Sequence, residues 1–199
     1  MAKKIQQRAI DTRNRILVAA RELFSERGYN GSAVDEIAAR AKANKQRIYA
    51  YFGSKQQLFE AVLLTLFNEV NLFAHTDMDD CPPAELTGRV LHGFMKIHAQ
   101  HPEFWRLLAW VNLDSGVQVA RLLDARSHEN TAIRGLFEQG VSSGVIREME
   151  FLEYIYALLA LSWFYYSNAR TLPVTLSPKL YEEEYKERLI ADMAKLFVP

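Results

Sequence analysis

The sequence predicts an all-α protein, and two observations lead to this prediction. Apolar residues recur three or four positions apart along most of the 199 residues, as Ile16, Ala20 and Leu23 do, and this spacing places them on one face of a helix. No stretch shows the sustained apolar–polar alternation that is typical of strands. Residues that favour helix ends, such as Gly28 and Pro102, separate the periodic stretches.

Composition and cysteine usage argue against a disordered, secreted or membrane-spanning protein. Hydrophobic residues make up 49% and charged residues 24% of the chain, as in ordinary globular proteins. The N-terminus lacks the apolar core of a signal peptide, and no run of about 18 apolar residues could span a membrane. Cys81 is the single cysteine, so no intrachain disulfide can form. We therefore expect a cytoplasmic protein with no membrane partner.

The net charge of zero hides an asymmetry along the chain. Residues 1–55 hold 12 Lys and Arg against 5 Asp and Glu, whereas residues 56–199 hold 12 against 19. A basic head on an acidic body is typical of a protein that offers one end to a polyanion. Chance clustering on a solvated surface is the alternative, and charge alone does not separate the two interpretations.

Three helices are expected in an N-terminal domain, for which we predict the bounds 1–56. The first helix should span residues 11–27, the second should be short and follow Ser32, and the third should span residues 45–51. Gly28 comes directly after the last periodic residue of the first helix, where a left-handed C-cap belongs.

The starts of the two short helices carry capping signals. Ser32 precedes Asp35 by three residues, which resembles a capping box with Asp in the place of Glu, and Asn44 is a suitable N-cap for the third helix. Only about two residues, Lys42 and Ala43, join the two helices. Two short amphipathic helices with so tight a connection predict a helix-turn-helix.

A second helical domain is expected over residues 57–199. Its leading helix should begin after Ser54, which forms a capping-box pair with Gln57, and should reach about residue 73. The Ser177–Pro178 pair is a further helix start, with Ser as the N-cap and Pro at the first helical position. The other expected helices cover residues 84–100, 103–114, 117–143, 150–170 and 178–197.

The third helix has an outer face that suits DNA. Ile48 and Phe52 are four residues apart and apolar, so they should face the core. Every large residue on the remaining faces can donate a hydrogen bond, and none is acidic, which suits a major groove lined by phosphates. The alternative is a solvated surface helix, which two exposed tyrosines disfavour. These outward residues are Lys45, Gln46, Arg47, Tyr49 and Tyr51.

Three segments between residues 12 and 62 resemble the DNA-binding domain of the TetR (tetracycline-repressor) family: AARELFSERGY, VDEIAARA and YAYFGSKQQLF. The resemblance covers about a quarter of the chain. It implies an all-α protein with an N-terminal three-helix helix-turn-helix DNA-binding domain and a C-terminal helical ligand-binding and dimerisation domain. It also implies a homodimer that binds double-stranded DNA at a palindromic operator.

The resemblance also assigns roles to residues. Arg47 and Gln46 would read base edges, because Arg pairs bidentately with guanine and Gln with adenine. Tyr49 and Lys55 would contact phosphates together with the basic arm of the first helix. The implied DNA-binding set is Lys45, Gln46, Arg47, Tyr49, Tyr51 and Lys55, and the arm residues are Lys3, Lys4, Arg8 and Arg13.

The turn departs from the family pattern. The family usually has Ala-Gly-Val-Ser there, whereas this chain has Ala41-Lys42-Ala43-Asn44. Lys42 stands where glycine serves a left-handed or tight conformation, at an expected local cost of about 1 kcal/mol. Lys42 could in return add a phosphate contact.

The C-terminal half predicts self-association independently of the resemblance. Residues 151–166 are apolar on nearly every face, and such a helix must be covered on two sides. The last helix adds Tyr185, Leu189, Met193 and Leu196 on one face. TetR-type proteins resemble one another in building a dimeric four-helix bundle from their last two helices, so we expect a homodimer.

Large rings with a few polar groups suggest an effector pocket in the second domain, although a packed aromatic core is the alternative. His98 and His101 are three residues apart, but no third metal ligand is evident, so we expect no metal and no cofactor. The expected effector-binding residues are Phe94, His98, Trp105, Trp110, Trp163 and Tyr166.

The expected function is transcriptional repression that a small apolar or aromatic effector relieves. The sequence contains no nucleophile motif, no glycine-rich phosphate loop and no carboxylates at metal spacing, so an enzyme is not expected and no catalytic residue is assigned. The alternatives are a TetR-like regulator that responds to a protein partner or has no effector, and one that activates transcription.

Overall fold

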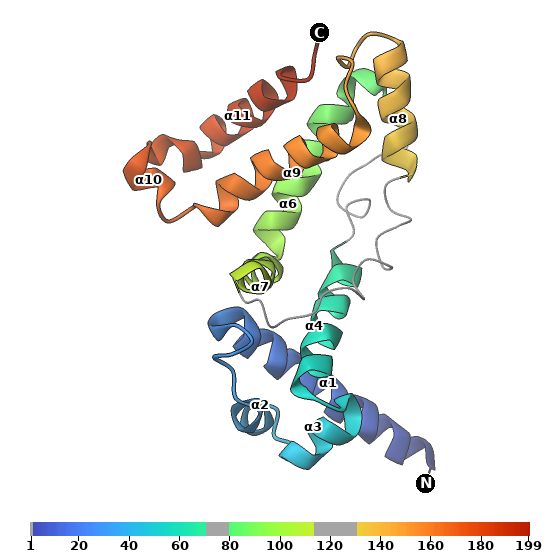
Figure 1. Ribbon diagram of the computed structural model, residues 1–199, viewed down its shortest axis with the longest axis vertical. Coiled ribbons are helices and arrows are strands. Elements are labelled where there is room, and N and C mark those ends of the chain that lie inside the picture. Colours follow the sequence, from blue (N-terminus) through green and yellow to red (C-terminus); the bar gives the residue numbers. More distant parts are fainter. Residues whose placement is uncertain (1, 71–79, 114–130) are drawn as a thin grey trace. The chain divides into compact units, whose positions relative to one another are not determined.

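The computed structural model describes residues 2–70, 80–113 and 131–199, and the described chain consists of helices and connecting turns, with no strand. The all-α prediction is confirmed. The chain forms two compact units (Figure 1). The first comprises Met1–Val70 and Pro102–Arg126, and the second comprises Asn71–His101 and Ser127–Pro199.

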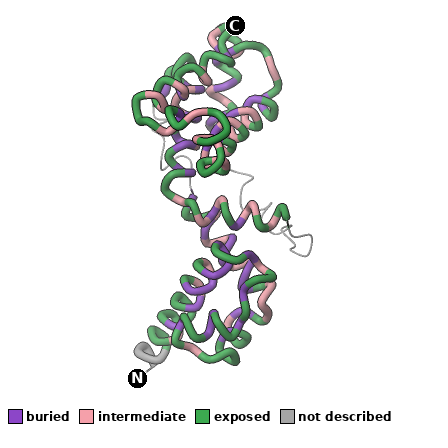
Figure 2. Tube along the Cα trace, turned by 90° about the vertical axis from the view of Figure 1, so that its left-hand side faces the viewer, coloured by how far each residue is buried: buried purple, intermediate pink, exposed green. Residues whose placement is uncertain are grey.

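The helices of the first unit pack around α1. They are α1 (Ala2–Arg27), α2 (Val34–Arg40), α3 (Lys45–Phe52), α4 (Lys55–Glu69) and α7 (Pro102–Leu113). Ile16, Leu23 and Phe24 are buried along the inner face of α1. Figure 2 shows buried stretches in purple among the helices near the N-terminus. The ring of Phe24 packs edge-on against Phe59 of α4, with 4.9 Å between ring centroids. Fully burying such a side chain contributes about 1.5–3 kcal/mol to the stability of the folded state. Since α1 buries several of them, it is the central helix of this unit.

The start of α1 corrects one prediction. The helix begins at Ala2 and not at residue 11. The added residues carry no apolar stripe, so periodicity could not reveal them. They are rich in Lys, Gln, Arg and Ala, which have high helix propensity and can extend an existing helix without tertiary contacts. The end of α1 follows the prediction, since Gly28 has a φ of +71° and its amide donates to the Phe24 carbonyl at 2.9 Å.

The predicted Ser32–Asp35 capping box is wrong. The N-cap of α2 is Ala33, whose amide donates to the Glu36 carboxylate at 3.5 Å. The Ser32 hydroxyl is buried and donates to the carbonyls of Leu23 and Gly28 at 3.0 and 2.8 Å. Ser32 therefore closes the end of α1, because a buried hydroxyl must find a partner and two carbonyls near that helix end lie beside it.

The second unit contains α6 (Leu86–Gln100), α8 (Thr131–Ser142), α9 (Phe151–Ser167), α10 (Leu172–Thr175) and α11 (Glu183–Lys195), with short 3-10 helices η1 (Pro83–Glu85) and η3 (Pro178–Tyr181). The centre of this unit is the pairing of α6 with α9. Tyr154 of α9 is buried there and its hydroxyl donates to the Thr87 hydroxyl at 3.0 Å. Burial raises the pKa of Tyr154 to about 12, so this hydroxyl stays protonated and available as a donor.

The expected single helix over residues 178–197 is interrupted. Ser177 caps η3 as predicted, by accepting from the Lys179 amide at 3.3 Å, but Glu182 is extended and α11 begins only at Glu183. The Tyr165 hydroxyl donates to the Leu180 carbonyl at 2.8 Å, within η3 and just before this break. Residues 71–73, 114 and 117–130 of the other expected helices lie outside the described residues.

Candidate functional site

The turn between α2 and α3 is built without glycine. Lys42 has a φ of +50°, the left-handed conformation expected at this position. The Ala43 amide donates to the Ala38 carbonyl at 2.9 Å and the Lys42 amide to the Ala39 carbonyl at 3.1 Å, which is the Schellman pattern of a helix end. Arg15 of α1 adds a hydrogen bond from its Nε to the Ala41 carbonyl at 3.2 Å. These bonds hold a strained lysine in a place that usually takes glycine.

The third helix presents the face that the sequence analysis predicts. Its N-cap is Asn44, whose side chain accepts from the Arg47 amide at 2.9 Å. Ile48 and Phe52 are buried, with 0% and 7% of their surfaces exposed, so they anchor α3 on the core. The opposite faces point to solvent. Lys45, Gln46, Arg47 and Tyr49 are exposed, and Tyr51 is half-buried.

Carboxylates of the first unit neutralise only some of its cations. Asp35 binds Lys45 with 2.9 Å between Oδ2 and Nζ, and this hydrogen bond raises the pKa of Lys45. Glu36 pairs with Arg27 at 3.0 Å. Other cations of this unit form no ion pair within the part of the chain that the structure describes: Arg8, Arg13, Arg15, Lys42 and Arg47.

The start of α4 holds another cation of the predicted DNA-binding set. Ser54 caps this helix, since its hydroxyl accepts from the Gln57 amide at 3.1 Å, as the sequence predicts. Lys55 follows directly and its Nζ lies 4.3 Å from the centroid of the Tyr29 ring. The ring attracts the ammonium group through its π face and fixes its direction without removing its charge.

Arg21 and Trp110 fasten α7 to the DNA-binding helices of the first unit. Arg21 of α1 pairs with Glu103 of α7, and its other nitrogen lies 2.7 Å from the Glu69 carboxylate at the end of α4. One guanidinium therefore ties three helices together. The sequence does not reveal this role of Arg21, because its two partners lie far away along the chain.

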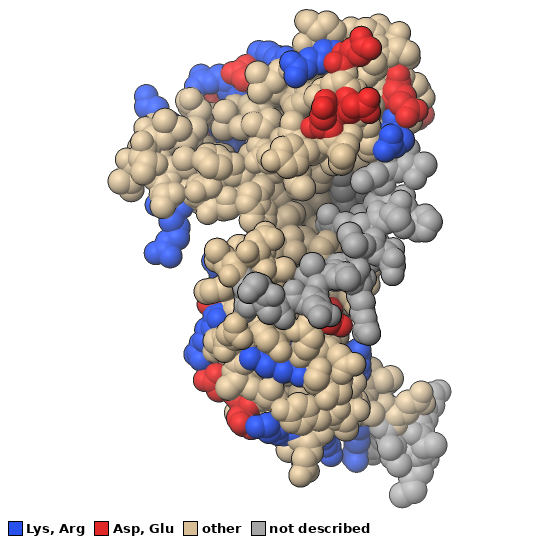
Figure 3. All heavy atoms as spheres, in the orientation of Figure 1, with Lys and Arg blue, Asp and Glu red and all other residues tan. Residues whose placement is uncertain are grey.

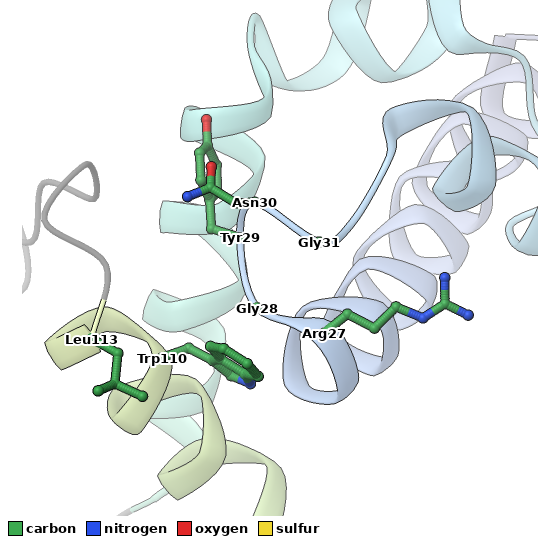
Figure 4. Close-up of a pocket in the computed structure, with 7 residues that line it drawn as sticks. All are labelled: Arg27, Gly28, Tyr29, Asn30, Gly31, Trp110 and Leu113. Carbon is green, nitrogen blue, oxygen red and sulfur yellow. The ribbon is translucent and has the colours of Figure 1, made fainter.

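Trp110 covers the end of α1. Figure 4 shows its ring beside Gly28, in a pocket of about 320 Å³ that Tyr29, Asn30 and Leu113 also line. A Cβ atom at Gly28 would lie 2.8 Å from the Trp110 ring, closer than side chains pack. Glycine is thus needed here both for the positive φ and for space, and only the first need is visible in the sequence.

Three of the predicted effector-binding residues meet in the second unit. His98 is buried, and its ring lies edge-on to those of Trp163 and Tyr166, with centroids 6.0 and 5.7 Å apart. Burial lowers the pKa of His98 from 6.5 to about 4, against a hydrogen bond with the Ser162 backbone that raises it. The imidazole is therefore neutral near pH 7. Phe94 lies half-buried on α6, whereas Trp105 and Trp110 belong to the first unit.

The second unit also exposes a large apolar surface. Leu152, Tyr156 and Phe164 follow one another along α9 with 77%, 72% and 56% of their surfaces exposed. Phe164 borders an almost wholly apolar groove of about 420 Å³, which continues over α10 to Leu189 and Met193 of α11. The area over α9 and α10 is correspondingly poor in charge in Figure 3.

Two further features are absent from the described residues. None of their helices combines the length and apolarity needed to cross a membrane. They contain no group of three or more His, Cys, Asp or Glu side chains placed to hold a metal ion.

Family models match both parts of the chain. Residues 16–62 match the model described as "Bacterial regulatory proteins, tetR family", and residues 83–196 match "Tetracyclin repressor-like, C-terminal domain". The chain is 32% identical to the HTH-type transcriptional repressor NicS of Pseudomonas putida over 94% of this chain and 92% of that protein. It is 33% identical to the HTH-type transcriptional repressor SCO4008 of Streptomyces coelicolor over 74% of this chain and 76% of that protein.

Solved structures share the fold. A TetR family transcription regulator from Marinobacter aquaeolei superposes with a TM-score of 0.71 at 17% identity, covering 96% of this chain and 98% of that one. The regulator PfmR from Thermus thermophilus gives a TM-score of 0.65 at 20% identity, covering 92% and 96%. Together with the helix-turn-helix and its basic surface, these matches establish that the chain belongs to the TetR family of DNA-binding transcriptional regulators and is not an enzyme.

Proposed function

We propose that this protein is a homodimeric repressor that binds a palindromic operator through α3 of each copy and leaves it when a small apolar or aromatic effector binds. One observation carries the DNA part of the proposal. α3 is anchored by buried Ile48 and Phe52 and directs only uncharged or basic side chains outward. A helix with that outer face is suited to the major groove.

The residues of this face divide into two roles. Arg47 and Gln46 read base edges, because both are exposed and Arg47 forms no ion pair within the described chain that it would have to break. Phosphate contacts position the duplex and come from Tyr49, Tyr51 and Lys55, with Arg8 and Arg13 of α1 in support. The residues that contact DNA all lie before about residue 56, and the remaining chain responds to the effector.

The apolar stripe of α9 and the groove beside it support the homodimer. Exposed Leu152, Tyr156 and Phe164 would lose contact with water if the same surface of a second copy covered them. A two-fold dimer places two α3 helices on half-sites about 34–36 Å apart, or a multiple of that distance, so the operator is palindromic.

The cluster of His98, Trp163 and Tyr166 supports an effector site in the second unit, with Phe94 of α6 as a further apolar wall. A neutral imidazole can donate or accept one hydrogen bond and so orient an aromatic ligand without a charge of its own. Relatives that are named repressors favour repression over activation. We place the protein in the cytoplasm, where its DNA is.

DNA binding is tested with labelled duplex from the promoter region of the protein's own gene. Fluorescence anisotropy should show a complex whose affinity falls roughly a thousandfold between 50 and 200 mM salt, as expected for six or more phosphate contacts. Absence of a complex at low salt would contradict the proposal.

Effector binding is tested by melting the protein with a panel of small aromatic compounds. A compound that raises the melting temperature and acts as an inducer should bind more weakly when operator is present, by the same factor by which it weakens operator binding. Equal affinities in calorimetric titrations with and without operator would show that the compound is not an inducer.

A further inference from the structure

The helix-turn-helix contains an internal competitor for one of its own cations. Asp35 lies in the first turn of α2 and Lys45 is the first residue of α3, and their side chains meet across the turn with 2.9 Å between Oδ2 and Nζ. Both groups are well exposed, with 71% of the Asp35 and 48% of the Lys45 side chain accessible to solvent. The pair therefore lies on the surface where DNA would approach.

We propose that the Lys45 ammonium group stays paired with Asp35 when the protein binds DNA and makes no phosphate contact. The pair then helps to hold α3 against α2, and Asp35 lowers the affinity for every duplex by the same factor. This inference rests on the proposed use of α3 as the DNA-reading helix, and it changes the role of Lys45 within that face. Lys45 can reach a phosphate only by leaving Asp35, and the carboxylate then lies near the phosphate and repels it.

Helix electrostatics favour the pair as the structure has it. A carboxylate in the first turn of α2, such as that of Asp35, lies at the positive end of that helix, where an anion is favoured. Lys45 is at the corresponding positive end of α3, where a cation is disfavoured unless an anion is close. Asp35 supplies that anion, and its hydrogen bond raises the pKa of Lys45.

Arg47 on the same helix makes the contrast clear. Within the described chain Arg47 forms no ion pair, so it can turn to a base edge without breaking an internal interaction. Lys45 has to exchange one anion for another, which yields little net binding. The arrangement leaves sequence reading to Arg47 and Gln46 and limits binding that does not depend on sequence. A repressor that must leave its operator benefits from this limit.

The test compares four proteins in salt titrations: wild type, Asp35→Asn, Lys45→Gln and the double variant. Each is titrated with the promoter duplex and with a scrambled duplex of the same composition. In Asp35→Asn, Lys45 is released to a phosphate, so the plot of log K against log salt should steepen by about 0.9. Affinity for both duplexes should rise by the same factor, about two- to fivefold, the range expected for an exposed ion pair.

Lys45→Gln should keep the wild-type slope, and the double variant should match Lys45→Gln, because the gain in Asp35→Asn acts through Lys45. Asp11→Asn is the matched control, since it removes one exposed carboxylate that accepts from Gln7 at 2.9 Å and forms no ion pair with any described residue. Its slope should stay at the wild-type value. Circular dichroism should show unchanged helix content in every variant.

Three results would overturn the inference. A slope that falls by about 0.9 in Lys45→Gln would mean that Lys45 already holds a phosphate in the wild type. An unchanged slope in Asp35→Asn would mean that the carboxylate does not restrain Lys45. An equal effect of Asp11→Asn would assign the gain to net charge alone. Failure of the wild type to bind either duplex would refute the proposed function itself.

Discussion

The helices α3 and α9 are both exposed on one side and buried on the other, yet they expose opposite chemistry. α3 buries Ile48 and Phe52 and turns polar hydrogen-bond donors outward. α9 buries Tyr154 and Leu158 and turns Leu152 and Phe164 outward. Exposed donors suit a partner that carries many acceptors, such as DNA, whereas exposed apolar rings need a partner that excludes water. The outer face of a helix therefore tells more about its partner than its inner face does.

The strongest test of this contrast is a charge in the apolar stripe of α9. Phe164→Glu should abolish the dimer, because a carboxylate cannot be buried in an apolar contact without a partner. Operator affinity should then fall about a hundredfold or more, since two linked half-site contacts become one. Analytical ultracentrifugation and anisotropy measure the two effects.

Val18→Glu is the matched control for that substitution. Val18 lies on α1 of the DNA-binding unit and is 56% exposed, the same fraction as Phe164. This variant should remain a dimer. If it dissociates as Phe164→Glu does, or if Phe164→Glu stays dimeric, the α9 surface is not the subunit contact.

Low pH should destabilise the second unit more than the first, because of His98. Its pKa is lowered by burial to about 4, from 6.5, and all five histidines of the sequence lie outside the first unit. The unfolded chain therefore takes up the proton first as pH falls. The stabilisation is fully present above pH 6.5 and is lost progressively down to about pH 4, with a total of about 3 kcal/mol at most.

Chemical denaturation followed by tryptophan fluorescence from pH 7 to pH 4 measures this loss. His98→Asn should flatten the dependence, whereas His92→Asn on the exposed face of α6 should not. Equal curves for wild type and His98→Asn would show that His98 takes up its proton without opposing folding.

Arg47→Ala tests whether the outer face of α3 reads the DNA sequence. Operator binding should weaken by about 1–3 kcal/mol and lose its preference at one or two base pairs. Arg106→Ala on α7 removes another exposed arginine without an ion pair in the described chain and should change neither quantity. A uniform loss over all sequences in Arg47→Ala would reduce Arg47 to a phosphate contact.

The smallest expected effect concerns the turn lysine. Lys42→Gly should stabilise the protein by about 1 kcal/mol, because glycine adopts a φ of +50° without strain. If Lys42 also contacts a phosphate, the salt slope should fall by about 0.9 at the same time. Lys42→Ala removes the charge but keeps a side chain at the positive φ. It should therefore show the same change in salt slope as Lys42→Gly, without the gain in stability. A destabilised Lys42→Gly would refute the strain argument.

Several local features could be predicted because their causes lie within one helical turn. Asn44 caps α3 through an amide three residues away, and Gly28 ends α1 through a carbonyl four residues away. Ser32 is the exception, because its hydroxyl donates back to the Leu23 carbonyl nine residues earlier and does not cap α2. Propensity, without any apolar stripe, extended α1 to Ala2.

The sequence by itself determined the helical class, the helix-turn-helix and the outer face of α3, because periodicity and caps act over three or four residues. Only the tertiary structure decided that α7 joins the DNA-binding unit through Arg21 and Trp110, and that the last expected helix is interrupted near the contact of Tyr165 with the Leu180 carbonyl. Trp110 lies 82 positions from Gly28 along the chain. Such contacts depend on how helices pack, and packing is set by the whole core at once.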